Sequence, residues 1–122
     1  MEMGPLTENE RLSNQARAQI LKAIAHPTRI FIVDKLQYGP RSVLELTQMI
    51  GADMSTVSRH LAILKSAAIL TSERKGTTIY YSLACPCVRS FLEGVEVVLQ
   101  HSVSQQAAAL GQQANRVATK GS

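Results

Sequence analysis

Apolar residues recur at helical spacing in the first third of the chain. An i, i+4, i+8, i+11 series predicts a helix over residues 12–24. Its apolar members are Leu12, Ala16, Ile20 and Ala23. The His26–Pro27 step ends this helix and begins a second one, because proline disfavours helix at the residue before it and suits the first helical turn. The second helix is predicted over residues 27–36, with Gly39–Pro40 as its stop signal.

Two shorter helices are predicted next, with a tight turn between them. Ser42 has a glutamate three residues later, which is the capping-box spacing, and the helix that it caps ends at Gly51. Asp53 or Ser55 caps the following helix, which is expected to run to about residue 68. Helical spacing is kept by its apolar residues, Val57, Leu61, Leu64 and Ala68.

After residue 68 the pattern changes from helical to β. Residues 69–74 and 77–83 are rich in β-branched and aromatic side chains and flank Lys75–Gly76, which predicts a hairpin with its tip there. A long last helix is predicted from about Pro86. Its apolar stripe consists of Val88, Phe91, Leu92, Val95, Val98, Leu99 and Val103.

This order of elements predicts an α+β, mainly α, fold: a winged helix-turn-helix with a two-stranded wing. The domain is expected over residues 11–104. Residues 1–10 precede the first apolar series and are expected to form a flexible arm. Residues 105–122 lose the apolar pattern and are expected to form a flexible tail.

Composition narrows the functional classes. A chain of 122 residues that is 45% hydrophobic suits a single core, and its net charge of +4 suits a phosphate-bearing partner. An aromatic content of 4% without tryptophan argues against base-stacking RNA surfaces. The first residues lack a signal-peptide pattern, and no apolar run approaches the ~18 residues that a membrane helix needs. We therefore expect a cytoplasmic protein, without membrane contact, whose two cysteines are thiols.

The helix that follows the Gly51–Asp53 turn has the residues of a DNA-reading helix. With its apolar side turned to the core, its other face carries short hydroxyls, an arginine and a histidine, which suit base edges and phosphates in the major groove. Arg74 and Lys75 at the hairpin tip form a basic wing. The predicted contacts to double-stranded DNA are Ser55, Thr56, Ser58, Arg59, His60, Arg74 and Lys75.

Residues 55–67 resemble the recognition helix of the ArsR/SmtB family of bacterial repressors, whose pattern is Ser-x-x-Ser-x-His-Leu-x-x-Leu. The basic hairpin, residues 80–83 and residues 25–29 are similar to other parts of that family. Two departures are Met54, where the family often has Gln, and Ala68, where it usually has Gly. The resemblance implies a homodimer joined through its first and last helices. The apolar stripes of those two helices support this, because so small a chain can hardly cover both.

The resemblance also implies a sensor for a metal, a metalloid or a redox signal. The family's cysteine site in the third helix is absent, since residues 44–47 contain no cysteine. By position, Cys85, Cys87 and His101 correspond to ligands of the family's last-helix site, while Val98 replaces another. Two sulfurs favour a thiophilic inducer, with arsenite or antimonite favoured and Cd²⁺, Zn²⁺ or Cu⁺ as alternatives. No obligatory cofactor is expected.

Alternative functions remain at this stage. The two cysteines suit thiol oxidation or inert packing as well as ion binding. A repressor without an inducer, or a winged-helix interaction module that does not read DNA, is a further alternative, although the basic wing argues against the module. An enzyme is not expected, because the chain has no Gly-rich phosphate loop and no spaced set of catalytic carboxylate, histidine or serine residues.

Overall fold

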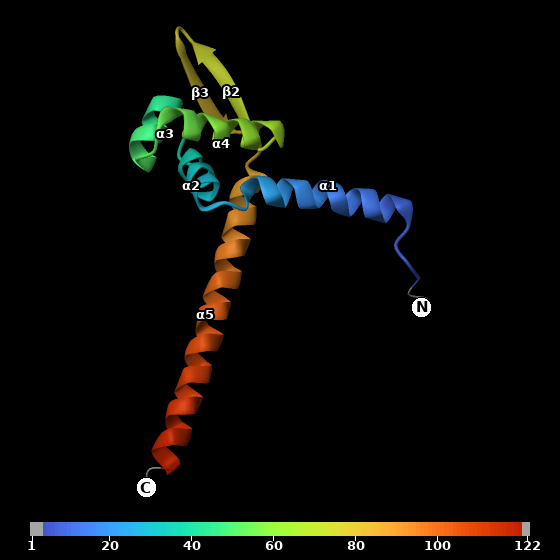
Figure 1. The fold of residues 1–122 in the computed structure, drawn as a ribbon, viewed down its shortest axis with the longest axis vertical. Helices are drawn as coiled ribbons and strands as arrows, with labels where there is room; N and C mark the ends of the chain where they lie inside the picture. The colour runs from blue at the N-terminus through green and yellow to red at the C-terminus, as the bar shows by residue number, and fades with distance from the viewer. Residues whose placement is uncertain (1–3, 121–122) are drawn as a thin grey trace. The chain divides into compact units, whose positions relative to one another are not determined.

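The computed structural model describes residues 4–120, with side chains described over residues 4–112. The chain divides into a unit that ends at Val88 and a unit that begins at Arg89. Figure 1 shows the elements in chain order: α1 (Glu8–Ile24), α2 (Pro27–Leu36), β1 (Arg41–Ser42), α3 (Val43–Ile50), α4 (Met54–Ser66), β2 (Leu70–Lys75), β3 (Thr78–Leu83) and α5 (Cys87–Lys120). No helix among the described residues is both long and apolar enough to cross a lipid bilayer.

The first unit is a winged helix-turn-helix, as the sequence predicts. In Figure 1, α2, α3 and α4 gather at the base of the β2–β3 hairpin. These elements share one apolar core. Burial of each large aliphatic side chain in it contributes about 1.5–3 kcal/mol to the stability of the fold. Its most buried members are Ile32, Val33, Leu36, Leu46, Val57, Leu61, Leu64, Ile69 and Leu70.

The ends of the two helices in the helix-turn-helix confirm the predicted signals. The Ser42 hydroxyl accepts the Glu45 backbone N–H at 3.1 Å, which begins α3. Gly51 ends α3 in the left-handed region at φ 79°, a conformation that glycine adopts without steric cost. Asp53, one of the two predicted caps, then begins α4. The short turn between these caps fixes α4 beside α3.

The sheet has one more strand than the sequence analysis predicts. β3 lies between β1 and β2, and both pairings are antiparallel. Arg41 is paired with Tyr81 and Ser42 with Tyr80. A strand of two residues is too short to give a period-two pattern, so only its partner forty positions away identifies it. The third strand anchors the wing to the residue that caps α3.

Helix α1 begins earlier than expected. The Thr7 side chain accepts the Glu10 N–H at 3.1 Å, and the Glu10 carboxylate accepts the Thr7 N–H at 2.8 Å. This is a complete capping box, so the helix starts at Glu8 rather than about Leu12. The last three residues of the expected flexible arm, residues 1–10, thus belong to α1, while residues 1–3 lie outside the described part.

Helix α5 runs further than expected. It continues to Lys120 and so includes residues 105–120 of the expected flexible tail, while residues 121–122 lie outside the described part. Residues 105–120 lack an apolar stripe but are rich in alanine and glutamine, which are strong helix formers. The loss of the apolar stripe therefore does not mark the end of the helix.

Candidate nucleic-acid interface

The N-terminal half of α4 separates a buried face from an exposed one. Val57 and Leu61 are completely buried. Ser55, Ser58 and Arg59, three of the predicted DNA contacts, are exposed. The structure therefore brings these three polar groups together on the open side of α4, where they are accessible to a large ligand.

Asp53 orders the hydroxyl groups at the start of α4. Its carboxylate accepts hydrogen bonds from the Ser55 hydroxyl, from the Thr56 hydroxyl at 2.6 Å and from the Thr56 N–H at 3.3 Å. These bonds, that from Ser55 first, lower the pKa of Asp53 to about 2. Because both hydroxyl protons are engaged, Ser55 and Thr56 can offer a further ligand only oxygen acceptors. Acceptors of this kind suit the amino groups of adenine or cytosine.

His60 lies one helical turn beyond Thr56 on α4 and contacts residues at the start of α2. Its ring is half-buried, and its Nδ1 is 3.2 Å from a terminal nitrogen of Arg29 in α2. The ring centroids of His60 and His26 are 4.6 Å apart. Burial first, and then the positive charges of His26, Arg29 and Arg59, lower the pKa of His60. The imidazole is therefore neutral near pH 7 and is engaged inside the protomer.

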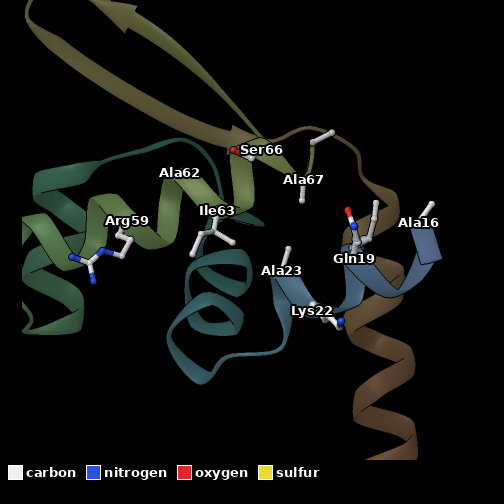
Figure 2. A pocket seen from close by; sticks show the side chains of 11 residues that line it. Ala16, Gln19, Lys22, Ala23, Arg59, Ala62, Ile63, Ser66 and Ala67 are labelled. Atoms are coloured by element: carbon white, nitrogen blue, oxygen red, sulfur yellow. The ribbon is translucent and has the colours of Figure 1, made fainter. Parts of the chain in front are cut away.

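A groove of about 850 Å³ separates part of α1 from the C-terminal half of α4 (Figure 2). Figure 2 shows Ile63 and Arg59 on the α4 side and Ala23 on the α1 side. Small and apolar side chains make up most of its lining. Over the length of the groove, α1 is therefore not packed tightly onto α4.

The wing places the predicted basic residues at its tip. Arg74 and Lys75 are the last residues of β2 and are exposed. Gly76 follows at φ 65°, which allows a two-residue turn before Thr78 pairs with Lys75. The Lys75 ammonium lies 6.0 Å from the centre of the Tyr80 ring. Two positive charges are thus held at the end of a regular hairpin.

Lys65 fixes the wing to α4. Its ammonium donates to the Ser72 hydroxyl at 2.6 Å, from the last turn of α4 to the third residue of β2. From the sequence alone, no role was predicted for Lys65 or for Arg29. Both contacts join residues of different elements, and no local pattern predicts such a pairing. For Arg29 the available signal was its place in the run of residues 25–29 that resembles the family.

Cys85 and Cys87 lie at the N-terminus of α5, as predicted. The structure joins them by a disulfide, with Cα atoms 5.2 Å apart, so it does not show the two free thiols that were expected. One intervening residue brings the Cα atoms within the range that a disulfide requires. The Cys87 N–H also donates to the Cys85 sulfur at 3.2 Å. Cys87 is exposed and Cys85 is half-buried, so both sulfurs lie near the surface.

The side chains that the structure describes do not form a metal site within one chain. The described residues contain no group of three or more histidine, cysteine, aspartate or glutamate side chains placed to hold an ion. His101 is exposed, and it lies fourteen positions beyond Cys87 in the sequence of α5. The two cysteines therefore provide at most two sulfur ligands from one protomer.

The fold, with its exposed basic helix and wing, defines a winged helix-turn-helix protein. Comparison with known proteins identifies its family. Residues 26–72 match the family described as "Bacterial regulatory protein, arsR family". The transcriptional repressor PagR of Bacillus anthracis is 34% identical over 85 residues, which cover 69% of this chain and 85% of PagR. The chain therefore belongs to the ArsR family of bacterial regulatory proteins.

Two further relatives agree with this assignment. The HTH-type transcriptional regulator NmtR of Mycobacterium tuberculosis is 39% identical over 75 residues, which cover 59% of this chain and 62% of NmtR. The solution structure of Mb0332 from Mycobacterium bovis, a homodimeric winged helix-turn-helix DNA-binding domain, has a TM-score of 0.72 and 29% identity. It covers 83% of this chain and 94% of the Mb0332 fragment. Both relatives carry regulator or DNA-binding names, in agreement with the family to which the chain belongs.

Proposed function

We propose that the chain is a cytoplasmic transcriptional repressor that binds double-stranded operator DNA, with α4 in the major groove and the wing on the adjacent backbone. The observation that carries the proposal is the exposed N-terminal half of α4, where Ser58 and Arg59 lie beside hydroxyls oriented by Asp53. An arginine fork bonds guanine or phosphate, and the positive end of a helix favours a phosphate. The Lys65–Ser72 bond supports the wing as part of the same surface.

The repressor acts as a homodimer in this proposal. Leu12 and Ile20 of α1 are 53% and 45% exposed, and Val98 and Leu99 of α5 are 68% and 54% exposed. Apolar faces of this extent on two helices are typical of surfaces that a partner covers. A two-fold dimer presents two copies of α4, which then read half-sites about one DNA turn, ~34 Å, apart. Mb0332 supports this arrangement because its solved structure is homodimeric.

The test of DNA binding is the double variant Arg59→Ala, Lys75→Ala. A gel-shift or anisotropy titration against the upstream DNA of the gene is expected to show a loss of about 100-fold or more, because each residue supplies a contact to base or phosphate. The salt dependence of binding should also become shallower. These two side chains lie on the exposed surface, so the variant should remain folded.

A matched control removes the same charge elsewhere. Arg11→Ala, Arg89→Ala breaks two exposed ion pairs, with Glu8 and Glu93, outside α4 and the wing. This control should retain affinity within about threefold. Equal losses in the two double variants would mean that only net charge matters, and the docking proposed for α4 would be wrong.

We further propose that a thiophilic ion, with arsenite or antimonite favoured and Cd²⁺, Zn²⁺ or Cu⁺ as alternatives, releases the repressor by binding Cys85 and Cys87. Binding requires the disulfide to be reduced first; the freed sulfurs then lie at the positive end of α5, where the Cys87 N–H donates to the Cys85 sulfur, an environment that favours a thiolate. Since one protomer offers only two sulfurs, a third ligand comes from the other protomer or from a non-sulfur group, for which His101 is a candidate.

Redox sensing is a second proposal, favoured by the disulfide between the same cysteines. Here two thiols lose two electrons and two protons to a peroxide, which is reduced to water and alcohol or to two waters. Cys85→Ser and Cys87→Ser are each expected to abolish release from DNA while leaving inducer-free binding intact. Release by arsenite in a reduced, anaerobic sample supports ion binding, whereas release by peroxide alone supports oxidation. Release by either agent in the double variant would rule out this site.

A further inference from the structure

One side chain, Arg29, links three helices. Its Nε donates to the Ala23 carbonyl at 2.6 Å, and one terminal nitrogen donates to the Lys22 carbonyl at 3.5 Å. Both carbonyls belong to the last turn of α1. The other terminal nitrogen lies 3.2 Å from Nδ1 of His60 in α4. Because Arg29 itself lies in the first turn of α2, a single guanidinium connects α1, α2 and the helix proposed to read DNA.

The bonds from Arg29 satisfy groups that the helix itself leaves unsatisfied. The last four carbonyls of a helix have no intrahelical partner and carry partial negative charge. A guanidinium supplies hydrogen-bond donors to these carbonyls and a positive charge that balances their partial negative charge. Its planar fork fixes the direction of each bond. Arg29 is half-buried, so water competes with these bonds less than it would on an open surface.

The link requires a neutral His60. Arginine only donates hydrogen bonds, so Nδ1 of His60 must be the acceptor and the ring proton must be on Nε2. The charged or titratable groups around the ring are all basic: His26 and Arg29 at the start of α2, and Arg59 on α4 itself. A proton on Nδ1 would remove the acceptor and place a second positive charge against the guanidinium.

We propose that Arg29 and neutral His60 form a link that sets the orientation of α4 relative to the end of α1, and that protonation of His60 weakens operator binding by releasing α4. The inference rests on the proposed function, since duplex DNA is the ligand whose affinity reports the orientation of α4. Arg29 is then a positioning residue, and His60 acts through it instead of contacting DNA as the sequence analysis expected.

The sign of the pH effect separates these two roles of His60. Burial and the neighbouring cations lower the pKa of His60 from its ordinary value of 6.5. The contribution of the link is therefore complete above pH 6.5 and is lost as the pH falls through the lowered pKa. A histidine that contacts a phosphate would act in the opposite direction, because protonation would strengthen its contact.

The decisive variant is His60→Asn, which keeps an acceptor near the position of Nδ1 and does not titrate. Operator affinity of the full chain is measured at about pH 8 and about pH 5.5. On acidification the original protein should lose about fivefold to tenfold more affinity than His60→Asn. Equal changes in the two proteins, or a relative gain by the original protein, would overturn the proposal.

Arg29→Lys tests the fork itself. It keeps the charge but cannot reach three acceptors in one plane, so operator affinity at about pH 8 should fall about tenfold. The difference in pH response between the original protein and His60→Asn should disappear in the Arg29→Lys background, because the two residues act as a unit. Arg11→Lys is the matched control and should change neither quantity. Additive effects of Arg29→Lys and His60→Asn would show that the two side chains act separately.

A second measurement does not depend on DNA. Thermal unfolding of the original protein and of His60→Asn is followed as the pH is lowered from 6.5, and the Tm of the original protein should fall by about 3–5 °C more. A parallel decrease would mean that neutral His60 does not hold α4. If the chain binds no duplex at any pH, the proposed function fails, while this comparison still decides whether the link exists.

Discussion

Helices α4 and α1 carry similar apolar series in the sequence, but the protomer buries only one of them. The apolar side of α4 is completely buried, at Val57, Leu61 and Leu64. In α1, Leu12 and Ile20 are 53% and 45% exposed, and burial is confined to the last turn, at Ala23 and Ile24. The comparison shows that helical periodicity identifies an apolar face but does not say which molecule covers it.

The same difference separates the helix-turn-helix from α5. Leu46 of α3 is completely buried, whereas Val95, Val98, Leu99 and Val103 of α5 are all about half exposed or more. The core of the helix-turn-helix is thus supplied by one chain. The apolar faces of α1 and α5 are the surfaces that our proposal assigns to the second protomer.

The largest expected effect is the loss of a core side chain of α4. Leu61→Ala should lower the free energy of unfolding by about 3 kcal/mol, because Leu61 is completely buried and its truncation leaves a cavity. The matched variant Leu12→Ala, which removes the same atoms from α1, should cost less than about 1 kcal/mol in dilute protein. Urea denaturation at low and high protein concentration measures both. Equal costs at every concentration would show that α1 already packs inside its own protomer.

The next effect concerns the apolar face of α5. Leu99→Asp should raise the dissociation constant of the dimer about 100-fold, or ~2.7 kcal/mol, because it places a charge in the proposed interface. Sedimentation velocity measures the change, and circular dichroism should show that helix content is retained. Gln100→Asp places the same charge at the neighbouring, exposed position and is the control. An unchanged dimer in Leu99→Asp would remove α5 from the interface.

The smallest effect tests the turn between α4 and β2. Ala68 has a positive φ of 62°, the left-handed conformation that favours glycine, at the position where the family usually has glycine. Relief of this strain exceeds the added entropy of the unfolded chain, so Ala68→Gly should stabilise the protein by about 0.5 kcal/mol. Thermal unfolding detects the gain, and Ala67→Gly, on the preceding residue, should destabilise it instead. A loss of stability in Ala68→Gly would contradict the reading of this turn.

Most of the fold could be predicted from local chemistry. Caps and breakers such as Ser42, Gly51 and Asp53 act within a few residues of themselves, so the sequence carries their full signal. Strand β1 could not be predicted, because its two residues are defined by pairing with Tyr80 and Tyr81. The start of α1 was predictable, since the capping box of Thr7 and Glu10 is a local pattern within four residues.

The candidate site was predicted less completely than the fold. Local spacing correctly separated the buried face of α4 from the exposed Ser58 and Arg59. The same spacing could not show that His60 is held by Arg29, because thirty-one positions separate the two residues in the chain. Nor could it show that Lys65 binds the wing. Contacts of this kind depend on packing angles between elements, and periodicity does not contain them.

The strand order β1-β3-β2 has a consequence for how the DNA-binding end assembles. The chain leaves the sheet after Ser42, forms α3 and α4, and returns to it at Leu70, so both helices form one loop closed by β3. The hairpin can form from neighbouring residues. The β1–β3 pairing, in contrast, requires closure of that whole loop, which lowers the entropy of the chain. We therefore expect completion of the sheet and docking of the helices to occur together. Fraying of the two-residue strand at Arg41 would loosen the helices and the wing together.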